Sequence, residues 1–324
     1  MNLPTQPVTR SLVELACRAP SVHNTQPWRW RISSDDSIEL WADRDRQLTV
    51  ADFDGRNLAI SCGAALHHVV VAGPALGVTA KVDLTPSPDE PDLLACIRVE
   101  SGAASRGAAE VLDAIERRCT DRRRFTSWPV PDSRLTRLAQ AAAGWGAFAI
   151  PILDASARFR CELLLSRAQV AQRSDQRFAQ EQQAWVDHIA VDGVPTLNGA
   201  PPSRDSSTSR NNRFEPETAD QNSGALLQGS DGLIVICTAL DHQQAWLASG
   251  QALSALWLRA TREGLSLVPL SQVVEVPETR NALHHDIFAG MAHAQILLRI
   301  GWQEIGRADL SPTPRRPVGD VLLP

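Results

Sequence analysis

Apolar positions along the chain form helix-like and strand-like stretches that alternate. Residues 10–21 and 133–144 are amphipathic, with apolar positions about 3.6 residues apart, which predicts a helix in each. Residues 93–100 and 294–302 are short apolar runs that we interpret as strands. This alternation predicts an α+β protein in which helices pack on a mixed sheet.

The helix–strand pattern occurs twice. GAALHHVVVAGPALGV at 63–78 and GQALSALWLRATREGL at 250–265 both begin Gly-x-Ala-Leu and close on a Gly followed by an aliphatic residue. The closing Gly suits the left-handed residue that often ends a helix. Gly63 and Gly250 match at the same offset as the other shared residues. We therefore expect two related halves that form a pseudo-dimer within one chain; chance agreement among small residues is the alternative.

The halves are expected to span residues 1–109 and 110–324. The second half carries an insertion at 191–224 that is rich in Pro, Ser, Asn and Gly and has no apolar period. Such a segment is typical of a lid, a binding loop or a disordered excursion. The tail, SPTPRRPVGDVLLP, is punctuated by prolines, so we expect no helix there but an extended strand of chain that wraps over another surface or stays loose.

Composition narrows the classes of function. The 324 residues carry a net charge of −5, which leaves no broad basic surface for non-specific nucleic-acid binding. The first residues lack an apolar signal core, and no apolar run approaches the ~18 residues of a membrane span. Six cysteines are scattered without metal-like spacing, as in reduced thiols. The adjacent pairs His67-His68 and His284-His285 diverge on a helix, so we expect no metal site. A cytoplasmic protein without nucleic-acid or membrane partners is predicted.

One string, APSVHNTQPWRW at residues 19–30, stands out. It leaves a helix, turns, and enters a strand at Trp28. Asn24 and Gln26 carry side-chain amides, whose donors and acceptors suit a heterocycle edge with alternating N–H and C=O groups. A capped turn followed by two aromatic strand residues, with no ligand, is the alternative interpretation.

A second string, RRCTDRRRF at residues 117–125, gathers several guanidinium groups beside a threonine hydroxyl. Forked guanidinium donors match phosphate oxygens, so this run predicts a phosphate clamp. A solvated face and a nucleic-acid patch are the alternatives, and Asp121 together with the acidic net charge weakens the latter. Arg315-Arg316 in the tail is a further basic element.

Together these motifs resemble the FMN-dependent nitroreductase family, and more closely its dormancy-associated, single-chain, two-copy (Acg-type) branch. APSVHNTQPWRW is the most specific element. RRCTDRRRF resembles the family's Arg-rich phosphate-binding opening, and GLSLVPL at 264–270 its Gly-Leu loop near the reactive flavin edge. RIGW and the later PTPRR resemble its closing strand and tail. The resemblance implies the nitroreductase-like fold, FMN as cofactor and NAD(P)H as reductant.

The motifs are divided between the halves. The first half has the Ser-x-x-Asn-x-Gln-Pro-Trp turn but no Arg cluster; the second has the Arg cluster, the Gly-Leu loop and the Arg tail, but AAAGWGAFAIP where its turn should be. Complementary loss of this kind predicts one FMN per chain, at the contact between the halves. Because a fused pair already contains the family's dimer interface, a monomer is plausible and a homodimer is possible.

The resemblance also implies roles for individual residues. The candidates for the FMN phosphate are Arg118, Arg122, Arg123 and Arg315. The candidates around the flavin ring are Ser21, Asn24 and Gln26, with Pro20 and Trp28 packing nearby, the backbone of Leu270 and Ser271 at the N5 edge, and Arg29 at the N1–C2=O edge. No residue is assigned as a catalytic acid or base, because the cofactor itself carries hydride and electrons.

Two functions remain open. The first is an oxidoreductase that uses NAD(P)H to reduce nitroaromatics or quinones. The second is an FMN storage or sequestration protein with little turnover, in which the 191–224 insertion closes over the flavin. Asn198, Asn211, Asn212 and Arg213 are the insertion residues expected to cover it.

Overall fold

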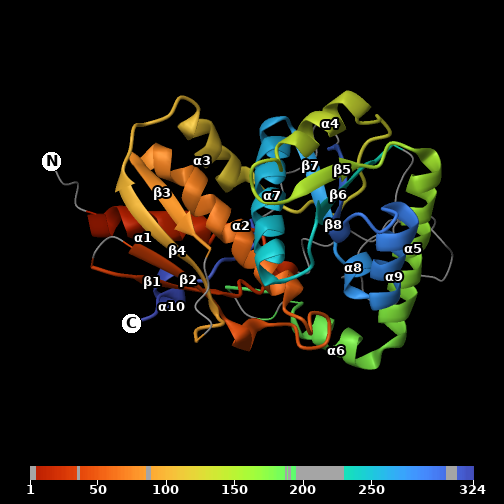
Figure 1. Ribbon diagram of the computed structural model, residues 1–324, viewed down its shortest axis with the longest axis horizontal. Helices are drawn as coiled ribbons and strands as arrows, with labels where there is room; N and C mark the ends of the chain where they lie inside the picture. Colours follow the sequence, from red (N-terminus) through yellow and green to blue (C-terminus); the bar gives the residue numbers. More distant parts are fainter. Residues whose placement is uncertain are drawn as a thin grey trace.

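The computed structural model describes residues 5–34, 37–84, 89–186, 188, 191–194, 230–303 and 312–324. Two sheets lie on opposite sides of the molecule, and two long helices, α2 (Arg56–Ala72) and α7 (Gln243–Arg262), lie together in its middle (Figure 1). Most of the predicted insertion, from residue 195 to 224, lies outside the described residues, as do Asn198, Asn211, Asn212 and Arg213.

The first half forms an antiparallel sheet with strand order β1-β2-β4-β3. Its elements are α1 (Thr5–Ala16), β1 (Trp28–Ile32), β2 (Ser37–Ala42), α2 (Arg56–Ala72), β3 (Val78–Asp83) and β4 (Leu93–Ser101). The helix expected at 10–21 thus begins and ends about one turn earlier, because Pro20 and the turn after it cannot continue a helix.

The second half repeats this order as β5-β6-β8-β7, again antiparallel. Its strands are β5 (Phe148–Pro151), β6 (Gly232–Thr238), β7 (Leu265–Leu270) and β8 (His293–Trp302). Its helices are α3 (Ala108–Arg117), α4 (Asp132–Gln140), α5 (Ala155–Ser174), α6 (Gln176–Ala184), α7 (Gln243–Arg262), α8 (Gln272–Glu275), α9 (Pro277–Ala282) and α10 (Val318–Val321).

The α+β class and the two related halves are therefore confirmed, while the sheets differ from the mixed sheet expected. In each half the fourth strand lies between the second and third, and every pair of neighbouring strands is antiparallel. Within the described residues, the parallel contact to a sheet is a single bridge between Trp30 and Leu322.

The two halves meet where α2 crosses α7. A Cβ atom on Gly63 would lie 2.0 Å from the Leu247 carbonyl oxygen, and one on Gly250 would lie 1.9 Å from the Ile60 carbonyl oxygen. These contacts are reciprocal, as an isologous interface requires. His67 Nδ1 lies 2.9 Å from the hydroxyl of Ser254, 187 residues later, which is its own counterpart in the repeat. The sequence repeat therefore marks a pseudo-two-fold axis.

Helix α2 carries apolar side chains on nearly all of its faces, and nearly all of its residues are buried. Its start is fixed by the Asp52 carboxylate, which accepts hydrogen bonds from the backbone N–H groups of Asn57 and Leu58 at 2.8 Å each. Contrary to the sequence expectation, Arg56–Leu76 has the length and hydropathy of a membrane span, but 78% of that window is buried inside the protein. It is a core helix by its packing.

The C-terminal tail crosses from the second half to the first. Leu323 donates a backbone hydrogen bond to the Trp30 carbonyl at 2.7 Å, beside the Trp30–Leu322 bridge. The tail thus wraps over another surface, but it also contains the short helix α10, which the proline spacing led us not to expect. The residues between Pro317 and Leu322 are free of proline, so one helical turn is sterically allowed there.

An ion pair also joins the halves. Arg56, at the start of α2, is 4% exposed and binds both carboxylate oxygens of Asp241 at 2.6 and 2.8 Å. The guanidinium lies over the ring of Trp246, whose indole N–H also donates to Asp241. Burial by itself would raise the pKa of Asp241, but these donors and the Arg56 charge outweigh it and hold that pKa well below its ordinary value.

Replacing Asp241 by asparagine should lower the free energy of unfolding by about 3 kcal/mol at neutral pH, because Arg56 would stay buried without its counter-charge. Since the folded pKa of Asp241 is lowered, its contribution is present above the unfolded value of about 3.9 and is lost as the pH falls below it. Urea unfolding from pH 7 to pH 3 should therefore show the parent–variant difference shrinking. Asp113→Asn, which breaks an exposed pair with Arg117, is the control; a difference independent of pH contradicts the assignment.

Candidate functional site

A cleft lies between the two halves. The empty space in it is about 780 Å³ when the solvent at its open mouth is included, and the enclosed volume is only about 100 Å³. The first half lines it with Pro20, Ser21, Val22, His23, Asn57, Ile60 and Ser61. The second half lines it with Thr120, Arg122, Leu253, Trp257, Val268, Pro269, Leu270, Ser271, Gln272 and Ile296. Apolar and polar side chains alternate along its walls, a mixture that suits a flat heteroaromatic ligand with polar edges.

Five of the residues singled out from the sequence line this cleft: Pro20, Ser21, Arg122, Leu270 and Ser271. Leu270 ends β7 and Ser271 precedes α8, so the Gly-Leu loop does reach the cleft. The Ser21 hydroxyl accepts the backbone N–H of Gln26 at 3.0 Å and so closes the turn beneath the cleft. The fold brings these five residues together from segments that are far apart along the chain.

Two arginines from opposite ends of the second half meet beside this turn. Arg118 and Arg315 both donate to the carbonyl oxygen of Arg18, each at 3.3 Å. Arg118 also lies over the ring of Trp257, a cleft residue, at 4.7 Å. Within the described residues neither guanidinium has a carboxylate partner, and the Nε atom of each is buried without a hydrogen bond.

The pKa values of both arginines are lowered, as expected for buried cations without a counter-charge. Burial lowers the pKa of Arg118 to about 10. Burial, followed by the charge of Arg118, lowers the pKa of Arg315 to about 9. Two buried cations, one of which lowers the pKa of the other, each have an unsatisfied donor and so favour an anion with several acceptor oxygens. The pair therefore fits a phosphate group by charge, but neither side chain lines the cleft, and Arg315 already donates to the Asn24 amide oxygen at 3.0 Å.

The other predicted arginines differ from this pair. Arg123 binds Asp121 through two hydrogen bonds of 2.8 Å, so its charge is already neutralised. Arg29 pairs with Asp43 at 2.9 Å and does not line the cleft, and Trp28 is fully buried in the core. Their expected places at the flavin are not supported by these contacts, because each side chain is committed elsewhere.

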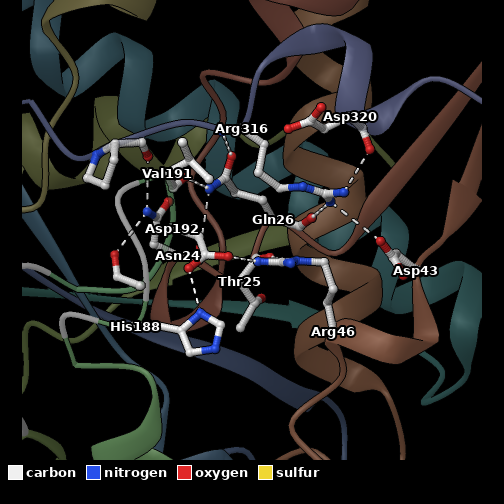
Figure 2. Close-up of polar contacts among 12 residues, drawn as sticks. Asn24, Thr25, Gln26, Asp43, Arg46, His188, Val191, Asp192, Arg316 and Asp320 are labelled. Atoms are coloured by element: carbon white, nitrogen blue, oxygen red, sulfur yellow. Dashed lines mark hydrogen bonds and ion pairs between the residues drawn. The ribbon is translucent and has the colours of Figure 1, made fainter.

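Asn24 and Gln26 point away from the cleft lining. The amide of Asn24 donates to the carbonyls of Gly193 and Pro314 at 3.0 and 3.1 Å and accepts from Arg315 at 3.0 Å. Gln26 donates to the Val191 carbonyl and accepts the backbone N–H of Arg316, both at 2.9 Å (Figure 2). Both amides would have to exchange these partners before they could bind a flavin.

The polar hub is the cluster of contacts formed by Asn24, Gln26, Arg46, His188 and Asp192. Its buried acid is Asp192. Asp192, 2% exposed, pairs with Arg46, which also donates to the Thr25 carbonyl. His188 Nδ1 lies 2.7 Å from the other Asp192 oxygen (Figure 2). Residues 191–194, the described start of the insertion, are thereby fixed to the same turn that lines the cleft. The polar residues of the turn indicate that its side chains form hydrogen bonds, but the sequence does not indicate which residues they bind.

In the second half, the segment that matches this turn in the sequence repeat packs against helices α2 and α7. Gly144 and Gly146 have left-handed backbones, with φ of 88° and 76°, where the first half has its turn. Between them Trp145 packs edge-on against His67, with ring centroids 4.3 Å apart. A Cβ atom on Gly146 would lie 3.1 Å from Ala248, so little room is left there.

The described residues contain no group of three His, Cys, Asp or Glu side chains that could hold a metal ion. Burial raises the pKa of Cys17 to about 12 and that of Cys161 to about 11, so these thiols stay protonated.

No family model matches the chain. A Mycobacterium tuberculosis protein named "Putative NAD(P)H nitroreductase" is 37% identical over 99% of this chain and 92% of its own length. Another from the same organism, named "Putative NAD(P)H nitroreductase acg", is 31% identical over 98% and 96%. Among solved structures, "a putative nitroreductase" from Anabaena variabilis is 9% identical over 94% of this chain and 90% of its own, with a TM-score of 0.46 that carries no further argument.

Proposed function

Because the chain belongs to the family of these NAD(P)H nitroreductase-like proteins, we propose that it is an FMN-binding oxidoreductase that uses NAD(P)H to reduce nitroaromatics or quinones. The observation that carries this proposal is the pair of buried arginines without counter-charge, Arg118 and Arg315, beside a cleft built by both halves. When bound, FMN would take hydride from NAD(P)H and pass two electrons to an acceptor.

In this proposal Arg118, Arg122 and Arg315 bind the FMN phosphate, and Trp257 holds Arg118 in place by stacking. Pro20, Ser21, Leu270 and Ser271 flank the ring. The apolar side chains of the walls exclude water from the reacting face, which strengthens every polar contact made there. Because Trp145, in the segment that matches the turn in the sequence repeat, packs against His67 of α2, we propose one FMN per chain.

A second function, FMN storage, is favoured by a specific observation. Asn24, Gln26 and Arg46 fix the start of the 191–224 insertion to the turn that lines the cleft. In this reading the insertion covers the flavin and nicotinamide cannot reach it, so FMN is held with little turnover.

Anaerobic stopped-flow mixing with NADH and with NADPH separates the two functions. If the protein is an oxidoreductase, the oxidised flavin band should bleach within seconds. The matched variant replaces residues 196–224 by a flexible Gly-Ser linker and keeps residues 191–194, which the turn holds. Bleaching that is absent in the parent over minutes but fast in this variant would reject the oxidoreductase and support storage. Absence of bleaching in both would reject reduction by nicotinamide altogether.

A further inference from the structure

The proposed reaction consumes protons as well as electrons, and the cleft offers few groups that can supply them. The polar side chains that line it are Ser21, His23, Asn57, Ser61, Thr120, Arg122, Ser271 and Gln272. Hydroxyl and amide groups keep their protons at neutral pH, and an arginine keeps its charge. Imidazole is the side chain that exchanges a proton there. Among the described lining residues, His23 therefore is the one suited to donate a proton.

The backbone at His23 is strained. His23 has φ 45° and ψ 22°, and Asn24 and Gln26 also have positive φ, of 55° and 51°. Left-handed conformations at residues other than glycine persist where the surroundings over-determine them, and they cluster at functional sites. If the turn had only a structural role, glycine could occupy these positions without backbone strain.

The surroundings that hold this turn are those of the polar hub. Asn24 and Gln26 are bound to residues 191–194 on one side and to residues 314–316 on the other. His23 precedes these two residues in the turn and lines the cleft, where it is only 5% exposed. The hub thus positions the histidine, and the strained backbone is what places it at the cleft wall.

We propose that His23 is the residue that donates a proton to the oxygen of the reduced acceptor. This inference rests on the proposed function. For a quinone, the hydride supplied through NAD(P)H and FMN brings two electrons and one proton. The second proton passes from the His23 imidazolium to a quinone oxygen, so that an N–H bond breaks and an O–H bond forms. The hydroquinone leaves, and water returns a proton to the neutral imidazole.

The test uses the full chain loaded with FMN and reduced by dithionite, so that it does not depend on nicotinamide. His23→Asn removes the titrating group, and asparagine tolerates the left-handed backbone at this position. Reoxidation by a benzoquinone should slow about 100-fold at pH 6, and its pH dependence between pH 5.5 and 8.5 should vanish. His285→Asn, at an exposed histidine outside the cleft lining, is the matched control. Reoxidation of His23→Asn within threefold of the parent overturns the proposal.

Two further measurements do not depend on that comparison. His23→Gly also accepts the positive φ, and added imidazole should restore at least a tenth of the parent's reoxidation rate; no rescue speaks against proton donation. In ¹⁵N-histidine NMR of the parent, the His23 signal should shift when hydroquinone binds, and a signal that does not move overturns the proposal. Failure of the proposed function would differ, because FMN would not bind or NAD(P)H would not reduce it while dithionite still did.

Discussion

Replacing Arg118 and Arg315 together by glutamine should weaken FMN binding about a thousandfold and leave riboflavin binding nearly unchanged. Each guanidinium offers charge-assisted hydrogen bonds to a phosphate, worth about 1.5–3 kcal/mol apiece. Both are buried, and the pKa of Arg315 is lowered to about 9 by burial and by Arg118, so the charge of a phosphate would offset the cost of burying the two positive charges. Isothermal titration of the parent and the variant with both flavins isolates the phosphate contribution.

The matched control for this prediction is Arg117→Gln, a neighbouring arginine that is exposed and already paired with Asp113 at 3.0 Å. It should leave FMN affinity within about twofold of the parent. Because Arg118 also stacks on Trp257, far-UV circular dichroism of the double variant should confirm that the fold persists. An unchanged preference for FMN over riboflavin in a folded double variant would place the phosphate elsewhere.

Gly63→Ala should lower the free energy of unfolding by about 3 kcal/mol or more. The added Cβ would lie 2.0 Å from the Leu247 carbonyl oxygen and 3.1 Å from the Gly250 Cα, so the two central helices must move apart along their whole crossing. Asn57, Ile60 and Ser61 stand on the same helix, so the cleft should widen and FMN affinity should fall as well. Thermal unfolding of the apo chain should show a midpoint lower by about 5 °C or more.

The pseudo-two-fold relation supplies the internal comparison. Gly250→Ala meets the Ile60 carbonyl oxygen at 1.9 Å, so its cost should match that of Gly63→Ala. Gly319→Ala, where nothing lies within 4 Å of the added atom, is the control and should shift the midpoint by less than about 1 °C. A Gly63→Ala midpoint within about 2 °C of the parent would mean that the helices can separate cheaply.

The sequence predicted the elements whose signals are local. Strands β1, β4 and β8 lie where they were expected. The apolar pattern that predicts a buried strand lies within the residues of the strand itself. The Gly-x-Ala-Leu repeat indicated two halves, because a close helix crossing admits no side chain at Gly63 or Gly250. The boundary between residues 109 and 110 stays a prediction.

Side-chain direction is where the sequence was insufficient. Asn24 and Gln26 were assigned to the flavin, whereas their amides bind backbone groups of residues 165 or more positions away. Arg123 carries the same chemistry as Arg118, yet only the fold decides that one faces Asp121 and the other a site without a counter-charge. His23 was overlooked because nothing in its neighbours along the chain indicates a left-handed backbone there.

The tail that pairs with Trp30 has one more consequence, for the exterior of the molecule. Strand β1 is the edge of the first sheet, and an uncovered edge offers free backbone groups to any other strand that meets it. Leu322 and Leu323 occupy part of that edge. A strand of another molecule that met β1 would therefore find part of this edge already occupied by residues of the second half.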